Sequence, residues 1–189
     1  MAIRIKTTWF KQVDGPKDSG QQAGVIASTI WKQADKTVTD LSKADFSIET
    51  PQRGFGLLAE LSVFMLHLSD RLAFERMDDA GRQTLMQALA VRLAEILEEN
   101  IHEVMHDHDH PYQADFIDLV NRRCEDYAGF DFPATLPDFS VLRYLGNRIC
   151  DIMDERDRSW IVDQVMELSA PDMMASVEKV VNGLFPKNT

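Results

Sequence analysis

Apolar residues recur every three or four positions along most of the chain, which is the period of a helix with one buried face. The pattern and its end signals predict helices over about 19–43, 50–76, 79–105, 111–129, 138–153 and 173–184, with a further apolar group at 160–166. Alternation typical of a strand is confined to residues 3–6 and 45–49. Long helices with short links predict an all-α fold, a single-domain bundle of about six helices.

Capping residues mark several of these helix ends. Thr50 and Pro51 are suited to the N-cap and first position of the second helix. Gly129 is suited to ending the fourth. Ser169 and Asp172 resemble a capping box with a proline between them, which predicts a separate last helix over roughly 173–184.

The first eighteen residues fit two patterns. Ile3 and Ile5 alternate with basic residues as in a strand, whereas Ile5 and Val13 also belong to a set of apolar residues at helical spacing. We treat residues 1–18 as a short N-terminal arm, with an extended conformation as one option. Residues 19–189 form the predicted bundle domain.

The amino-acid composition and net charge limit the classes of molecule that the protein is expected to bind. The chain has 189 residues, enough for one domain with a sizeable core, and 44% of them are apolar. Its net charge is −11, from 31 acidic and 20 basic residues, so its surface repels phosphate groups. We therefore expect no nucleic-acid partner and no membrane partner.

Localisation is predicted from the N-terminus and the cysteines. The first residues lack the apolar core of a secretory signal. The most apolar run, 57–68, is too short and too polar to span a bilayer. Cys124 and Cys150 each lie inside a helical pattern and form no CxxC motif, so we expect reduced thiols in a cytoplasmic protein.

Residues 102–106 contain a candidate metal motif. His102, Glu103 and His106 match HExxH, in which two imidazoles on one helix face bind Zn²⁺ and the glutamate polarises a bound water. Over these five residues the chain resembles the zincin metallopeptidases, which implies a third ligand about twenty residues further on, where Glu125 stands.

Helical geometry argues against a catalytic zinc centre. On a helical projection, His102 and His106 lie opposite the apolar stripe of their helix, on the same side as Glu99. That stripe consists of Met86, Leu89, Leu93, Leu97 and Val104. Histidines are also favoured in a last helical turn by the helix dipole. We interpret the motif as a solvated helix end, and a metallopeptidase as the least supported metal protein.

The same segment contains two overlapping ExxH units, Glu99 to His102 and Glu103 to His106. ExxH resembles the ferritin-like di-iron proteins, which imply one such unit on each of two helices. The second helix has a histidine, His67, but no glutamate three residues before it. Binding of zinc or of a di-iron centre by Glu99, His102, Glu103 and His106 therefore remains the alternative to a protein without cofactors.

The second helix carries a polar stripe along an otherwise apolar surface. Arg53, Glu60, His67 and Arg71 fall on one line at helical spacing, beside Asp70. We favour the interpretation that this line is the exposed edge of the helix. The other interpretation is a buried stripe that meets another helix or subunit, in which Glu60, His67, Asp70 and Arg71 pair with one another.

Motifs of catalysis are scarce, since neither a Gly-rich phosphate loop nor GxSxG occurs. The second helix is apolar over much of its circumference and needs cover on several sides. A dimer interface or a central position would supply that cover. We therefore expect a non-enzymatic protein that acts through protein–protein contact, as a homodimer.

Overall fold

The structure, a computed structural model, describes residues 18–131 and 138–186. The predicted arm therefore lies outside the described residues, apart from Asp18. Within these ranges there are helices and no strands, which confirms the all-α prediction. In chain order the elements are α1 (Ser19–Lys43), α2 (Pro51–Phe74), α3 (Asp79–Met105), α4 (Tyr112–Ala128), α5 (Phe139–Ile152), α6 (Arg158–Gln164), the π-helical turn η2 (Val165–Ser169) and α7 (Ala170–Leu184).

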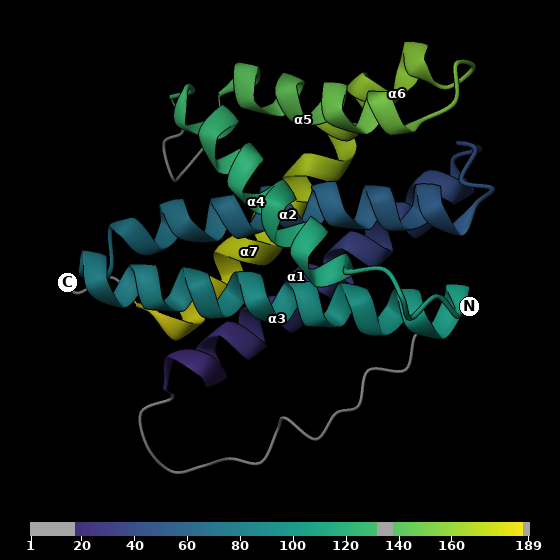
Figure 1. Ribbon diagram of the computed structural model, residues 1–189. Helices are drawn as coiled ribbons and strands as arrows, with labels where there is room; N and C mark the ends of the chain where they lie inside the picture. The colour runs from purple at the N-terminus through teal and green to yellow at the C-terminus, as the bar shows by residue number, and fades with distance from the viewer. Residues whose placement is uncertain (1–17, 132–137, 187–189) are drawn as a thin grey trace.

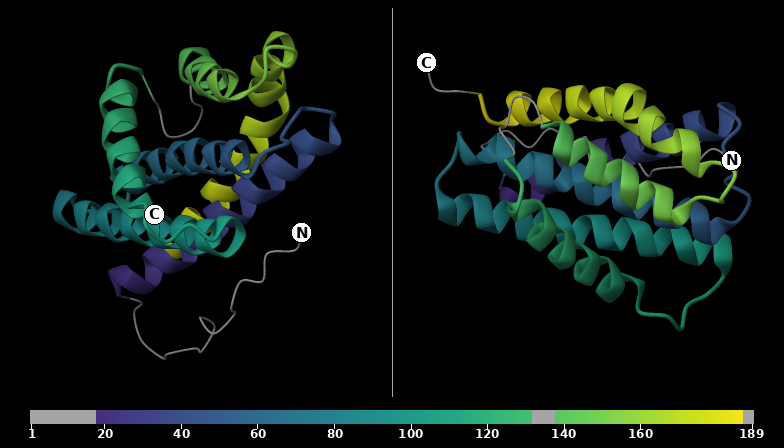
Figure 2. Two further views of the ribbon diagram at one scale, coloured as in Figure 1. Left: turned by 45° about the vertical axis from the view of Figure 1, so that its right-hand side comes forward. Right: turned by 90° about the horizontal axis from the view of Figure 1, so that it is seen from above.

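Helix α2 occupies the centre of the bundle. It contacts α1, α3, α4, α5 and α7. Figure 1 shows it between α3 on one side and α5 with α6 on the other, and Figure 2 shows α4 rising from the α3 side to the α5 side. The chain itself thus covers the apolar circumference of α2, so this helix does not by itself require a second subunit.

The core is built from the inner faces of these helices. Its fully buried side chains include Ile26 of α1, Phe64 of α2, Leu89 of α3 and Met173 of α7. Burying such side chains is the main favourable contribution to folding. In the described part of the chain, no helix combines the length and the apolar character that crossing a membrane requires.

Local capping explains where the first three helices begin. The side chains of Asp18, Thr50 and Asp78 each accept a hydrogen bond from the backbone N–H three residues further on. Pro51 follows Thr50 in the first turn of α2, as its missing N–H allows. These are the boundaries that the sequence predicted for α2 and α3.

The predicted last helix over 173–184 lies within α7, but the predicted capping of a separate helix by Ser169 is wrong. Ser169 has helical dihedral angles, φ −76° and ψ −44°, and its side chain forms no capping hydrogen bond. The helix runs without a break from Arg158 to Leu184, because the π turn η2 accommodates the irregular step between α6 and α7. The described chain therefore contains six uninterrupted helical segments.

Candidate functional site

The HExxH segment does not lie on one continuous helix face. Helix α3 ends at Met105, and His106 is its C-cap in the left-handed region, with φ 56° and ψ 24°. The backbone N–H of His106 donates to the carbonyl oxygen of His102 at 3.1 Å. The helix therefore ends one residue before the last position that the helical projection used, although His106 is exposed, as that projection predicted. His102 is half-buried, whereas His106, Glu103 and Glu99 are exposed.

A different histidine lies beside His102. The ring centroids of His102 and His108 are 4.5 Å apart, and the Tyr112 ring lies 6.1 Å from His102. The Tyr112 hydroxyl donates to Asp107 Oδ2 at 2.7 Å, which ties the loop after α3 to the start of α4. His102 Nε2 is buried and has no hydrogen-bond partner in the described chain.

Beyond this pair, the histidine-rich loop forms local bonds. His110 Nε2 lies 2.5 Å from Asp115 Oδ2 in the first turn of α4. Among the residues that the structure describes, no three His, Cys, Asp or Glu side chains are grouped so that they could hold a metal ion. The zincin pattern is therefore not assembled here, and Glu125, its expected third ligand, is exposed on α4.

The polar stripe of α2 is largely buried. The exposed fractions of Glu60 and His67 are 7% and 6%. The favoured interpretation of the stripe as an exposed edge is therefore wrong for these two residues, because α4 packs over them.

Glu60 forms a bidentate ion pair with Arg123 of α4. Arg123 Nε lies 2.9 Å from Glu60 Oε2, and Arg123 Nη2 lies 2.5 Å from Glu60 Oε1. Their side chains are 14% and 9% exposed. The hydrogen bond to Glu60 raises the pKa of Arg123 far above its usual value. Arg123 Nη1 also contacts Asp126 Oδ2 at 3.2 Å, and the Tyr144 hydroxyl of α5 donates to the same carboxylate.

Three aromatic rings continue this arrangement. His67 stacks on Tyr127 of α4 with ring centroids 4.7 Å apart, and Tyr127 meets Tyr144 edge to face at 5.3 Å. We call Glu60, His67, Arg123, Asp126, Tyr127 and Tyr144 the polar seam.

The protonation states of the polar seam are fixed by burial. Burial, and to a lesser degree the charge of Arg71, lower the pKa of His67 to about 4, while Asp70 opposes the change. Burial also raises the pKa of Tyr127 well above its usual value, and burial with the hydrogen bond to Asp126 raises the pKa of Tyr144 to about 12. At neutral pH the imidazole is therefore uncharged and both phenols keep their protons.

The remaining stripe residues bind other elements. Arg53 forms two hydrogen bonds with the Asp154 carboxylate, at 2.7 and 2.8 Å. Asp70 accepts from Arg82 of α3 at 2.6 Å, and Arg71 is half-buried. Glu60 and Asp70 thus find their ion-pair partners on α4 and α3, so the expected pairing within the stripe is wrong for these two carboxylates.

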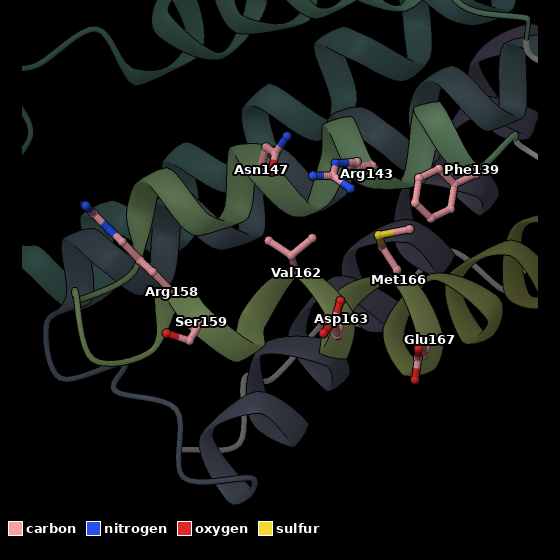
Figure 3. A pocket seen from close by; sticks show the side chains of 9 residues that line it. All are labelled: Phe139, Arg143, Asn147, Arg158, Ser159, Val162, Asp163, Met166 and Glu167. Carbon is pink, nitrogen blue, oxygen red and sulfur yellow. The ribbon is translucent and has the colours of Figure 1, made fainter.

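Sequence reasoning missed a groove between α5 and the helix formed by α6 and η2 (Figure 3). It has a volume of about 270 Å³. We call it the α5–α6 groove; its lining residues are Phe139, Arg143, Asn147, Arg158, Ser159, Val162, Asp163, Met166 and Glu167.

The two walls of the groove approach closely at one point. A Cβ on Gly146 of α5 would lie 2.9 Å from Cγ1 and 3.3 Å from Cα of Val162. Only a residue without a side chain allows this approach, so Gly146 sets the spacing of the two helices.

Large apolar side chains are exposed on the helices that form the groove. Phe139, which lines it, is 61% exposed. Trp160 and Leu168 directly follow two lining residues and are 71% and 61% exposed. We call these three residues the apolar rim. No sequence signal marked it, because each of the three belongs to an ordinary helical pattern and its exposure depends on how α5 and α6 pack.

Compared with known proteins, the chain matches no family model, and no curated protein or solved structure is significantly similar to it.

Proposed function

We propose that the protein is non-enzymatic and acts through contact with another protein chain, made by the surface that α5, α6 and η2 present. The observation that carries this proposal is the exposure of three large apolar side chains, the apolar rim, on the helices that form the α5–α6 groove. Large exposed apolar side chains are typical of protein-interaction sites, and tryptophan is enriched among the residues that dominate binding energy.

The position of the π turn η2 is a second observation in favour of the same interaction surface. η2 contributes Met166 and Glu167 to the groove and Leu168 to the apolar rim. Single π turns inside α-helices are rare and occur frequently at functional sites. The irregular turn therefore stands where the proposed contact is made.

The polar seam lies on the side of α5 that faces α4, and we assign it a structural role. Glu60, Arg123, Asp126 and Tyr144 already bond to one another, and the ion pair of Glu60 with Arg123 holds α4 against α2. We also place the protein in the cytoplasm, because Cys124 and Cys150 are free thiols.

Site-specific photocrosslinking tests the proposed contact. A benzoylphenylalanine placed at Trp160 should give discrete protein adducts in cells. The matched control position is Val91 of α3, which is 50% exposed and lies outside the groove. Adducts at position 160 and none at 91 would support the proposal, and equal labelling at both positions would overturn it.

Metal binding is the second candidate function, favoured by the buried and unpartnered His102 Nε2. The neighbouring His108 could supply a second imidazole to zinc or iron, whereas the sequence had placed His106, Glu103 and Glu99 there. Residues 102–110 hold four histidines and two aspartates, so such a stretch also collects metal from buffers.

Elemental analysis of untagged protein tests this second candidate. One equivalent of a single metal that is lost in both His102→Ala and His108→Ala would support it. Metal that persists in both variants, or metal-free parent protein, would overturn it. A parallel His106→Ala variant separates the HExxH ligand set from the pair of His102 and His108.

A further inference from the structure

Charges line the α5–α6 groove without ion-pair partners in the described chain. Arg143, Arg158, Asp163 and Glu167 all border it, and none of them forms a salt bridge within the described residues. The groove therefore contrasts with the rest of the acidic surface, because it presents two positive and two negative charges in a chain of net charge −11.

These charges are separated along the groove. Figure 3 shows Arg158 at one end and Glu167 at the other, with Val162 between them. A two-fold axis through the middle of the groove would exchange the two ends. Arg158 of one copy would then lie opposite Glu167 of a second copy, and the reverse pair would form by symmetry.

We infer that the α5–α6 groove is the interface of a homodimer with two-fold symmetry, in which Arg158 of each copy pairs with Glu167 of the other. The inference rests on the proposed function and names its partner as a second copy of this chain. The order of the charges Arg158 and Glu167 along the groove is self-complementary, as an interface between identical surfaces requires.

Charge reversal tests the pairing directly, by sedimentation velocity over a concentration series. Arg158→Glu and Glu167→Arg each replace two attractive contacts by two repulsive ones, so each variant alone should dissociate at least about tenfold more readily than the parent protein. An equimolar mixture of the two variants restores both attractive pairs and should form heterodimers. The double variant in one chain should likewise recover dimers.

The matched controls are Lys179→Glu and Glu178→Arg, which make the same changes of net charge at exposed positions of α7. They should dissociate like the parent protein. Circular dichroism of all variants establishes that each one folds, so loss of dimers cannot be mistaken for unfolding.

Two results would overturn the inference. A parent protein that remains monomeric at about 100 μM, well above the Kd of ordinary specific interfaces, excludes the dimer. A dimer that is insensitive to both reversals places the interface elsewhere. In either case, adducts at position 160 with a different protein would leave the proposed function standing, whereas their absence would remove it as well.

Discussion

Both sides of α5 carry polar and aromatic side chains, but those on one side bond within the chain and those on the other side are exposed. Towards α4, Tyr144 bonds to Asp126 and lies under Arg148, whose guanidinium is 5.4 Å from the ring centroid. Towards α6, Arg143 and Asn147 line an open groove beside the exposed ring of Phe139. On the first side the polar groups bind to the rest of the chain, and on the second side they face solvent.

This difference separates residues that hold the fold together from residues available to a partner. Polar groups that are buried must find partners within the chain, so their removal should cost stability. Charged and apolar groups that the fold leaves exposed contribute little to stability, so their removal should change association instead. The following variants test that separation.

The largest loss of stability is expected from Arg123→Ala. The variant leaves the Glu60 carboxylate buried without its cation, which should lower the free energy of unfolding by about 3–5 kcal/mol. Urea unfolding followed by circular dichroism measures the change. The double variant Glu60→Leu/Arg123→Leu removes both charges and should be clearly more stable than Arg123→Ala. A loss below about 1 kcal/mol for Arg123→Ala, as for an exposed pair, would contradict the role of the polar seam.

The next effect is a dependence of stability on pH caused by His67. Its folded pKa of about 4 lies below the unfolded value of 6.5, so the unfolded state takes up a proton first as the pH falls. The stability contribution is complete above pH 6.5 and is lost between pH 6.5 and 4, by at most about 3 kcal/mol. Urea titrations from pH 7 to 4.5 should show this slope in the parent protein and a smaller slope in His67→Leu. A His106→Leu control should keep the parent slope, because His106 is exposed.

A smaller loss is expected from Gly146→Ala. The added methyl group would meet both the side chain and the backbone of Val162, so α6 must move away from α5 at a cost of about 1–3 kcal/mol. Thermal unfolding compares this variant with Gly183→Ala in α7, where nothing lies within 4 Å of the added atom. The control should be neutral or slightly stabilising. Equal effects at both glycines would show that the close approach does not set the spacing of the groove.

The smallest effect on stability is expected from Trp160→Ser. Because the side chain is 71% exposed, the free energy of unfolding in dilute protein should change by no more than about 0.5 kcal/mol. If Trp160 contacts a second copy, the melting temperature of the parent protein rises with concentration while that of the variant does not. A large loss in dilute protein would instead assign Trp160 to the fold.

Local signals were sufficient to predict much of the fold. The bounds of α1, the proline start of α2 and the aspartate cap of α3 depend on residues within one helical turn, and the sequence displays them. Ser169 shows the limit of such signals. It has the residue type of a cap, yet tertiary packing on both sides of it keeps the helix continuous: Val165 and Ala170 are both fully buried.

The site was harder to predict because its contacts are distant in sequence. The stripe with Glu60 was visible, but its partner Arg123 stands 63 positions away, and no local pattern relates the two. The helical projection of α3 also failed near its end. Val104, assigned to the apolar stripe, is 40% exposed, whereas Ile101 is buried. Beyond Met105 the left-handed residue His106 ends the period on which the projection depended.

The π turn also determines how the sequence of this region can change in length. Deleting one residue from Val165–Ser169 would let the backbone return to α geometry. Because a π turn accommodates one residue more than an α turn, this deletion would leave the faces of α6 and α7 close to their present register, with α7 in place against α1 and α2. A deletion from the regular α-helical part of α6 would instead turn the residues before it by about 100° relative to α7 and present a different surface on the same core.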